Sequence, residues 1–266
     1  MSKNLIKNQF YKNGFVILKN ILNNYKYIET CSELNLKVNK YLLKYNLNNF
    51  GGYLSGNLNF DPGIDAWIIW KHLIPKLSPY FQKITNKKIS DFDIMVGGNI
   101  NFPSSSDQHI HADGNFYPRI IVINVPLVQI NEMNGPTEIF KKSHKEWMPY
   151  WKFFFIKKSF SSTYLKLDLG DVAIREHRLW HRGTKNKSNK ARAMLAFVLK
   201  EKLLNNNEYD NKDKLKKSSN RIRIYPNWFS NTLYGKIVEN IYKFLPKLYS
   251  CYRFIRSFFV KKYKYS

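Results

Sequence analysis

Two histidines and an aspartate stand at alternate positions in the segment SSSDQHIHADGNFYPR, which covers residues 104–119. Because successive side chains of an extended strand point to opposite faces, His109, His111 and Asp113 would project to the same side. Imidazole nitrogens combined with a carboxylate oxygen suit iron(II), and the lack of thiolates argues against a structural zinc site. The segment therefore predicts part of a metal site that needs a further ligand from elsewhere in the chain.

The segment EHRLWHRGTKNKSNKARAML, residues 176–195, offers that ligand together with an anion-binding group. We choose His181, because a turn centred on residues 186 and 187 would make it face Arg192 across an antiparallel hairpin. A planar, permanently charged guanidinium near a metal can hold a small carboxylate through two hydrogen bonds. Two histidines and one carboxylate leave three positions of iron(II) open, so an iron-bound 2-oxo acid with a second carboxylate fits this arrangement.

The remaining histidines have weaker claims as ligands. His109 would share the face of His111, so a shifted ligand pair stays open, with a place beside the metal shell or the substrate as the alternative. His177 and His181 have the spacing of a helical zinc pair, but the chain has no HExxH pattern, and we expect His177 to be structural or at a pocket rim. Two others are expected in structural or surface positions: His144 at a turn and His72 on a helix.

Two asparagines and one glycine-rich stretch have a functional and a structural interpretation each. Asn99 and Asn101 share one face of the strand that precedes the ligand segment, where they could contact a cosubstrate or satisfy neighbouring backbone groups. The stretch GGYLSGNLNFDPG, residues 51–63, lacks the lysine of a phosphate-binding loop, so it is either a lid on the substrate side or an ordinary loop.

The surrounding sequence changes from helical spacing to short apolar runs. Residues 5–22 predict a short helix, a turn at Asn13-Gly14 and a strand over Phe15–Leu18, and residues 27–47 and 64–86 predict helices that cover another layer. From 92 to 200, turn residues such as Gly97-Gly98 separate the apolar runs, which favours a β-sandwich or jelly roll. The predicted strands are Ile94–Val96, Ile120–Val125, Thr137–Phe140, Val172–Ile174 and Ala193–Leu199.

Taken together, these segments resemble the phytanoyl-CoA dioxygenase family over most of residues 8–200. QFYKNGFVILKNIL resembles the first segment of that family, HAD at 111–113 matches its HxD ligand motif, and NGPTEIFKKSHK at 134–145 is similar to its asparagine-glycine-proline segment. LGDVAI followed by LWHRG matches the segment around the distal histidine, and the spacing of eleven between His181 and Arg192 is that of the family.

The resemblance implies an iron(II)/2-oxoglutarate-dependent dioxygenase on a double-stranded β-helix, a jelly-roll core with flanking helices. It places His111, Asp113 and His181 on iron(II) and Arg192 on the far carboxylate of 2-oxoglutarate, with Asn99 and Asn101 as weaker cosubstrate candidates. With O2, such enzymes release succinate and CO2 while they oxidise a C–H bond of the substrate. Retention of Asp113 favours hydroxylation, since related halogenases have a small residue there.

Two positions depart from the family pattern, and both bear on the cosubstrate contacts. Gly183 stands where members often have a small hydroxyl residue, and Lys142 stands where a glycine precedes Ser-His. The substrate class that we expect is a small or a lipid- or sugar-linked metabolite. The alternatives are a catalytically silent metal-binding scaffold and a peripheral membrane-binding protein on the same fold.

The net charge of +25 is concentrated towards the C-terminal end, where residues 211–266 contain 14 Lys and Arg but 2 Asp and Glu. On a helical wheel one apolar arc runs from Leu233 to Phe259, and Pro246 must divide this region into two short amphipathic helices. The apolar face could pack on the catalytic domain or on a second subunit, which we favour, or lie on an anionic membrane surface. Nucleic acid is the least favoured partner, because no recognition motif accompanies the charge.

These patterns divide the chain into an oxygenase domain, a linker and an appendage. The oxygenase domain spans 1–204, with a helical cover over 1–90 and a jelly-roll core over 91–204. Residues 205–220 are a polar linker or loop, and 221–266 form the basic aromatic helical appendage. Without a signal-peptide core or an apolar run of about 18 residues, the sequence favours a cytoplasmic protein, with peripheral attachment to the inner membrane surface as an option.

Overall fold

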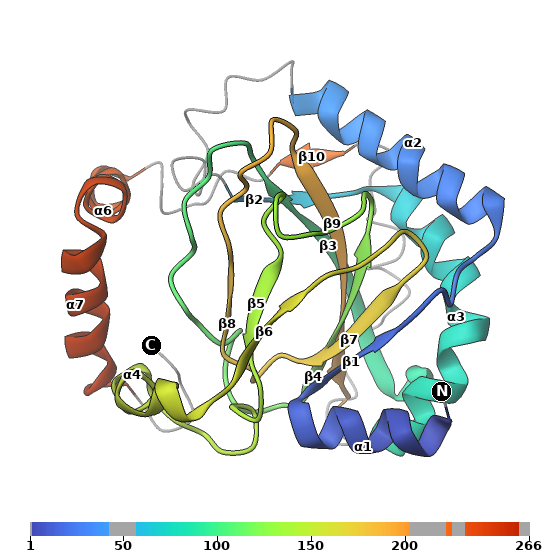
Figure 1. Cartoon of the computed structure of the whole chain (residues 1–266), viewed down its shortest axis with the longest axis horizontal. Helices are drawn as coiled ribbons and strands as arrows, with labels where there is room; N and C mark the ends of the chain where they lie inside the picture. The colour runs from blue at the N-terminus through green and yellow to red at the C-terminus, as the bar shows by residue number, and fades with distance from the viewer. Residues whose placement is uncertain (1, 43–56, 203–221, 225–231, 261–266) are drawn as a thin grey trace.

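Two β-sheets form the centre of the computed structural model, which describes residues 2–42, 57–202, 222–224 and 232–260 (Figure 1). Neighbouring strands in both sheets are antiparallel. The large sheet has the order β1 (Phe15–Leu18), β7 (Val172–Glu176), β4 (Ile120–Pro126), β9 (Arg192–Glu201), β3 (Phe92–Asn101), β2 (Asn57–Asp61) and β10 (Arg223–Ile224). The small sheet has the order β6 (Ser162–Leu165), β5 (Thr137–Phe140) and β8 (His181–Gly183). All five strands predicted between residues 92 and 200 are present.

Three N-terminal helices cover the large sheet, as predicted: α1 (Lys3–Asn13), α2 (Tyr25–Leu42) and α3 (Ile64–Thr85) (Figure 1). Aromatic contacts fix α3 against the sheet, with ring centroids 4.6 Å apart for Trp70 and Phe197 and 5.1 Å for Phe81 and Phe92. The helical spacing of residues 64–86 predicts Ile64 and Ile68 on the buried face of α3, but this is wrong, since they are 46% and 42% exposed. They lie on its solvent side, because a helix that packs on one sheet buries one stripe only.

The predicted turn at Gly14 is confirmed. Gly14 has φ 83°, and its N–H donates to the carbonyl of Phe10 at 2.7 Å, which ends α1 with a left-handed residue. Its carbonyl then accepts from the backbone N–H of Glu176 at 2.9 Å, so the turn leads directly into the pairing of β1 with β7.

Gly97-Gly98, by contrast, is not a break. Strand β3 continues through both glycines and pairs with β9 over its whole length. A Cβ on Gly98 would lie 2.1 Å from the ring of Phe60 on β2, so the glycine allows this aromatic ring to lie on the strand.

The hairpin predicted between His181 and Arg192 is also wrong. His181 lies on β8 of the small sheet and Arg192 on β9 of the large sheet, where its partner is Asn101. The polar residues between them form a crossover, fixed by buried Asn186, whose amide donates to the carbonyls of Asn101 at 3.0 Å and Lys190 at 2.8 Å. His181 and Arg192 therefore lie on different sheets.

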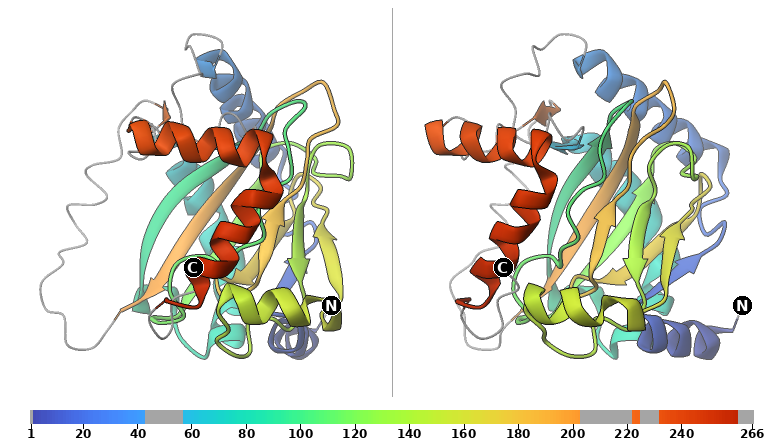
Figure 2. Two further views of the ribbon diagram at one scale, coloured as in Figure 1. Left: turned by 90° about the vertical axis from the view of Figure 1, so that its left-hand side faces the viewer. Right: turned by 60° about the vertical axis from the view of Figure 1, so that its left-hand side comes forward.

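Pro246 divides the C-terminal region as predicted, into α6 (Leu233–Phe244) and α7 (Pro246–Ser257). Helix α7 packs beside α4 (Tyr150–Ile156) at one side of the sheets (Figure 2). The described residues also include two short 3-10 helices, η2 (Ile89–Asp91) and η3 (Lys157–Ser159). The predicted linker 205–220, and residues 43–47 and 51–56 of the predicted helix and loop, lie outside the described residues.

Packing of the C-terminal apolar arc on the catalytic domain is contradicted. The arc residues are largely exposed, among them Leu233 at 78%, Leu248 at 53% and Ile255 at 55%. The polar side of α7 faces the domain instead: Arg253 and Ser257 are buried there. Within the described residues, none of the helices is long and apolar enough to span a bilayer.

Candidate metal centre

The segment before His111 continues the small sheet beyond β8. His111 and His181 exchange backbone hydrogen bonds of 2.9 and 2.8 Å, and the N–H of Gln108 donates to the carbonyl of Gly183 at 2.8 Å. Residues that exchange both backbone hydrogen bonds lie directly opposite each other, with their side chains on the same face. The two imidazole rings accordingly lie with centroids 4.5 Å apart.

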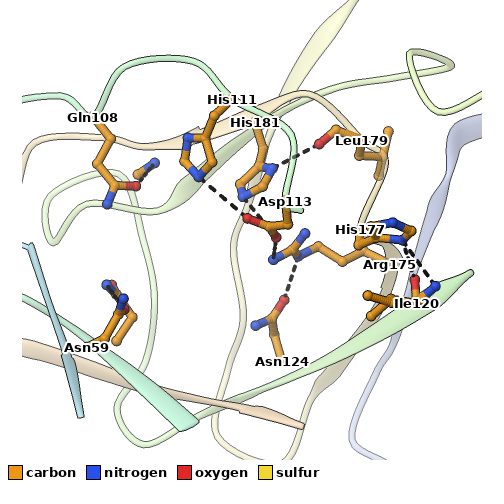
Figure 3. Close-up of polar contacts among 12 residues, drawn as sticks. Asn59, Gln108, His111, Asp113, Ile120, Asn124, Arg175, His177, Leu179 and His181 are labelled. Carbon is orange, nitrogen blue, oxygen red and sulfur yellow. Dashed lines mark hydrogen bonds and ion pairs between the residues drawn. The ribbon is translucent and has the colours of Figure 1, made fainter. Parts of the chain in front are cut away.

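The carboxylate of Asp113 joins these two rings (Figure 3). Its Oδ1 lies 3.6 Å from Nε2 of His111 and its Oδ2 lies 3.6 Å from Nε2 of His181. One potential ligand atom from each of the three residues lies within 4.8 Å of the others, and among the described residues this is the group found able to hold a metal ion.

Hydrogen bonds orient both histidines with Nε2 towards the centre. Nδ1 of His111 lies 2.9 Å from the carbonyl of His109, and Nδ1 of His181 lies 2.9 Å from the carbonyl of Leu179. A carbonyl can only accept, so each Nδ1 carries the proton and each Nε2 presents its lone pair. This is the tautomer that a metal ligand requires.

Burial sets the charges of the triad. It lowers the pKa of His181 to about 3 and also lowers the pKa of His111, so both rings are neutral near pH 7. Burial alone would raise the pKa of Asp113, but the neighbouring His181, Arg175 and His111 lower it well below its usual range. Two neutral imidazoles and one carboxylate are the protonation states that bind a divalent cation.

Arg175 on β7 is a contact of this centre that the sequence reasoning missed. Its Nη2 donates to Oδ2 of Asp113 at 2.9 Å, and its Nε donates to Oδ1 of Asn124 at 3.1 Å (Figure 3). Its Nη1 is buried without a hydrogen-bond partner. The available signal was a charged residue within the apolar run VAIRE, because a buried charge needs a partner.

Arg192 on β9 is a buried cation for which the described residues provide no counter-ion. Its Nη2 donates to the carbonyl of Gly135 at 2.6 Å and its Nη1 to Oδ1 of Asn99 at 3.3 Å, while Nε has no partner. Burial is the one cause that lowers its pKa, to about 10, and no ion pair within the described part of the chain includes it. A buried guanidinium in this state favours an anionic ligand.

A cavity of about 410 Å³ connects the triad to both arginines and is lined by both sheets. Thr137 on β5 also lines the cavity and pairs with Gly183 on β8. A hydroxyl residue therefore lies beside Gly183, the position where the family pattern often has a hydroxyl residue and this chain has glycine. A larger cavity of about 580 Å³ near α1 and α3 has no histidine, cysteine or carboxylate in its lining. Further residues of the metal-centre cavity are Asn59, Asn99, Gln108, Asn124 and His177.

The two asparagine candidates lie in different surroundings. Asn99 lines the cavity beside Arg192. Asn101 is buried outside the cavity lining, where its amide donates to the carbonyl of Thr184 at 2.7 Å and its Oδ1 accepts from Ser105 at 2.5 Å. These contacts agree with the structural interpretation of Asn101.

The other histidines lie outside the metal group. The ring of His109 lies 5.2 Å from that of His111 and 5.6 Å from that of Tyr249 on α7. Both ring nitrogens of His177 are used: Nδ1 accepts from the N–H of Ile120 at 3.1 Å and Nε2 donates to the carbonyl of Asn115 at 2.7 Å. His144 is buried and His72 is exposed.

Lys142 has a conformational reason to be glycine in relatives. Its φ is 70°, in the left-handed region that glycine adopts without strain. The residue lies in the turn after β5, where its backbone N–H donates to the carbonyl of Asn13 at 3.3 Å. The departure at Lys142 thus concerns backbone strain, while Gly183 lines the cavity itself.

Known proteins share both the sequence pattern and the fold. The family model described as Phytanoyl-CoA dioxygenase (PhyH) matches residues 70–194, which include the triad and Arg192. AviO1 from Streptomyces viridochromogenes Tue57 is similar with a TM-score of 0.59 and 12% identity over 75% of this chain and 95% of that chain. The non-heme alpha ketoglutarate dependent epimerase SnoN from nogalamycin biosynthesis has a TM-score of 0.58 and 15% identity, over 75% of this chain and 83% of that chain.

EctD from S. alaskensis, solved with 2-oxoglutarate and 5-hydroxyectoine, has a TM-score of 0.57 and 12% identity over 76% of each chain. At such identities, likeness to solved structures establishes the shared fold alone. The β-sheet core with flanking helices is thus of the double-stranded β-helix type.

Proposed function

We propose that this chain, a member of the phytanoyl-CoA dioxygenase family and a 2-oxoglutarate-dependent oxygenase, hydroxylates a C–H bond of a small or a lipid- or sugar-linked metabolite. In this proposal His111, Asp113 and His181 hold iron(II), and Arg192 holds the far carboxylate of 2-oxoglutarate. Membership of the family indicates the cofactor iron(II) and the cosubstrates 2-oxoglutarate and O2. The residue roles and the hydroxylation outcome are what we propose.

The donor set of the triad fits iron(II). Two neutral imidazoles with Nε2 directed inward and one carboxylate provide three ligands and leave room on the cavity side for a bidentate 2-oxo acid. When bound, iron(II) and 2-oxoglutarate supply the oxygen activation, in which O2 converts 2-oxoglutarate to succinate and CO2 as the substrate C–H bond is hydroxylated.

Hydrogen bonds within the chain orient the residues that would bind the metal and the cosubstrate. Arg175 fixes the carboxylate of Asp113 through one hydrogen bond and is itself fixed by Asn124, so the ligand has a defined orientation before metal binds. The carbonyl of Gly135 and the side chain of Asn99 fix Arg192 in the same way. The apolar strands around the cavity exclude water from the reacting C–H bond.

One observation carries the proposal: buried Arg192, which lines the same cavity as the triad, has an unpartnered Nε and no counter-ion among the described residues. A dicarboxylate that reaches from the metal to this guanidinium would satisfy both ends of the cavity. Thr137, which lines the cavity beside Gly183, offers a hydroxyl that can donate to the same far carboxylate.

The substrate class is less restricted than the cofactor. SnoN is described as an epimerase and EctD was solved with 5-hydroxyectoine, so proteins of this fold carry out different outcomes on different metabolites. We favour hydroxylation because Asp113 keeps the third ligand position that a halide would otherwise need.

An anaerobic titration with Fe(II) and 2-oxoglutarate tests the proposal through the weak visible charge-transfer band of the chelate. The wild type should develop the band, His111→Ala should lose it, and Arg192→Ala should need at least about a hundredfold more 2-oxoglutarate. His72→Ala, on the exposed face of α3, is the matched control and should behave as wild type. A folded wild-type protein without a band would refute the oxygenase assignment of this site and favour a silent metal-binding scaffold.

A further inference from the structure

Helix α7 is amphipathic with its apolar side outward. Its polar residues face the domain: Arg253 Nη1 donates to the carbonyl of Ile110 at 2.9 Å, and Ser257 Oγ accepts from the backbone N–H of Trp151 at 2.9 Å. The opposite side carries Leu248, Tyr252, Ile255 and Phe259, with exposures of 53%, 43%, 55% and 84%. A surface helix normally shows the reverse arrangement, whereas this apolar side of α7 stays largely exposed within the part of the chain that the structure describes.

Helix α4 enlarges the same surface. It packs beside α7 (Figure 2). The ring centroid of Phe254 on α7 lies 5.4 Å from that of Phe154 and 5.6 Å from that of Phe155. Phe154 and Phe155 are themselves 41% and 67% exposed. We call the exposed apolar residues of α4 and α7 the α4–α7 face: Phe154, Phe155, Ile156, Leu248, Tyr252, Ile255, Phe258 and Phe259.

The two segments that form the α4–α7 face carry charge of one sign. The sequence has no Asp or Glu between residues 147 and 167 or between 240 and 266. Lys152, Lys247 and Arg256 are exposed on α4 and α7, and Lys158 is exposed on η3, directly after α4. Aromatic and aliphatic side chains bordered by cations are the composition of helices that lie in the interface of an anionic bilayer.

We propose that the α4–α7 face docks this protein on anionic membrane surfaces. The cations attract the acidic headgroups, and the apolar side chains enter the boundary between headgroups and acyl chains. A second copy of the chain is a poorer occupant, because a two-fold contact through this face would bring its cations together without carboxylates to pair them.

Docking would bring the candidate metal centre close to the bilayer side of the molecule. Arg253 contacts Ile110, the residue before His111, and the ring of Tyr249 lies 5.6 Å from that of His109. The strand that carries His111 therefore lies directly beneath α7. Membrane docking would give the enzyme a place to meet an amphiphilic substrate, but it does not depend on the residue roles proposed for the site.

Vesicle co-sedimentation of the full chain tests the proposal. Wild type should bind vesicles of phosphatidylcholine with phosphatidylglycerol much more tightly than vesicles of phosphatidylcholine alone, and added salt should weaken the binding. Ile255→Glu and Phe259→Glu should each weaken it at least about tenfold, since an apolar side chain is replaced by an anion. Leu36→Glu, at a residue 68% exposed on α2, is the matched control and should bind as wild type.

A charge reversal separates the electrostatic part. Lys247→Glu with Arg256→Glu should weaken binding at least about tenfold and reduce its salt dependence, whereas Lys71→Glu with Lys76→Glu on exposed positions of α3 should change it much less. Equal binding of the α7 and control variants would overturn the proposal.

The oligomeric state gives the other decisive outcome. If wild type sediments as a dimer that Ile255→Glu converts to monomer, and neither binds vesicles, a second copy covers the α4–α7 face and the membrane proposal is wrong. The charge-transfer titration is performed without vesicles on the same preparations, so failure of membrane docking and failure of the oxygenase assignment are distinguished.

Discussion

Replacing Arg192 by methionine should separate ligand binding from folding, because this cation is buried and has no anionic partner among the residues that the structure describes. Burial lowers its pKa from 12.5 to about 10, and at about 1.4 kcal/mol per pKa unit the charge destabilises the ligand-free fold by roughly 3 kcal/mol. Its hydrogen bonds to Gly135 and Asn99 offset this by about 1.5 kcal/mol each. The free energy of unfolding of ligand-free Arg192→Met should therefore stay within about 1 kcal/mol of the wild-type value.

With 2-oxoglutarate the two proteins should differ. Loss of a buried charge partner weakens binding by about 3–4 kcal/mol, which is a few hundredfold in the dissociation constant. At a concentration one hundred times the wild-type dissociation constant, 2-oxoglutarate added to the Mn(II)-loaded protein should raise the wild-type unfolding free energy by about 2.7 kcal/mol. The same concentration should raise that of Arg192→Met by less than about 0.5 kcal/mol.

The assay is urea unfolding of each protein without ligands, with Mn(II) alone, and with Mn(II) and 2-oxoglutarate, so that the response to 2-oxoglutarate is measured on the Mn(II)-loaded protein. Arg182→Met is the matched control, because this arginine has ion pairs with Glu138 and Asp107 and lies outside the lining of the metal-centre cavity. It should destabilise the fold by about 1–3 kcal/mol and keep the response to 2-oxoglutarate. If ligand-free Arg192→Met loses more than about 3 kcal/mol of unfolding free energy, Arg192 has a structural counter-ion and the reasoning is refuted. If the variant responds to 2-oxoglutarate as wild type does, Arg192 does not hold the cosubstrate, and the reasoning is refuted as well.

Substitutions at three further positions test other parts of the structure. Lys142→Gly should raise the unfolding free energy by about 0.5–1 kcal/mol in urea, because φ is 70° there, and a loss of stability would contradict the strain argument. Burial lowers the pKa of His144 to about 4, so the free energy of unfolding should fall by up to about 3 kcal/mol as pH decreases from 6.5 to 4. His144→Asn should flatten this part of the pH profile. An unchanged profile would show that protonation of His144 is not linked to unfolding. Arg175→Ala should weaken Mn(II) binding about 10–100-fold in calorimetry, because Asp113 loses the hydrogen bond that orients it. Arg175→Gln can still donate to Asp113 and should weaken Mn(II) binding less. Equal weakening in both variants would show that the charge of Arg175, and not its hydrogen bond, supports metal binding.

Strand positions were predictable from sequence to the extent that they carry apolar runs. The strands of the large sheet between residues 92 and 200 are buried on at least one face, and their runs of Ile, Val, Leu and Phe indicated them. Strand β8 was not predicted, because its three residues HRG have neither alternation nor an apolar run. It is held by pairing with β5 and with the segment around His111, which are contacts between parts of the chain distant in sequence.

Local turn chemistry could not distinguish a hairpin from a crossover. Asn186 and Ser188 suit a turn in either case, and the side chain of Asn186 does organise one, accepting from the N–H and Oγ of Ser188 at 2.9 and 2.7 Å. What decides the topology is that Arg192 pairs with Asn101, a residue 91 positions earlier. The side chains of His181 and Arg192 still line one cavity, but from two sheets and not from one hairpin.

The direction of an amphipathic face is likewise a tertiary property. The helical wheel correctly collected Leu248, Tyr252 and Ile255 on one side of α7, yet periodicity gives a face and not the side on which the domain lies. Arg253 decides it: its aliphatic stem can be buried while its guanidinium reaches the carbonyl of Ile110 and lies 4.5 Å from the ring of Tyr150. A helix attached to its domain by a buried arginine presents its apolar side to whatever lies outside. For that reason the apolar side of α7 is exposed even though its sequence pattern is that of an ordinary packing helix.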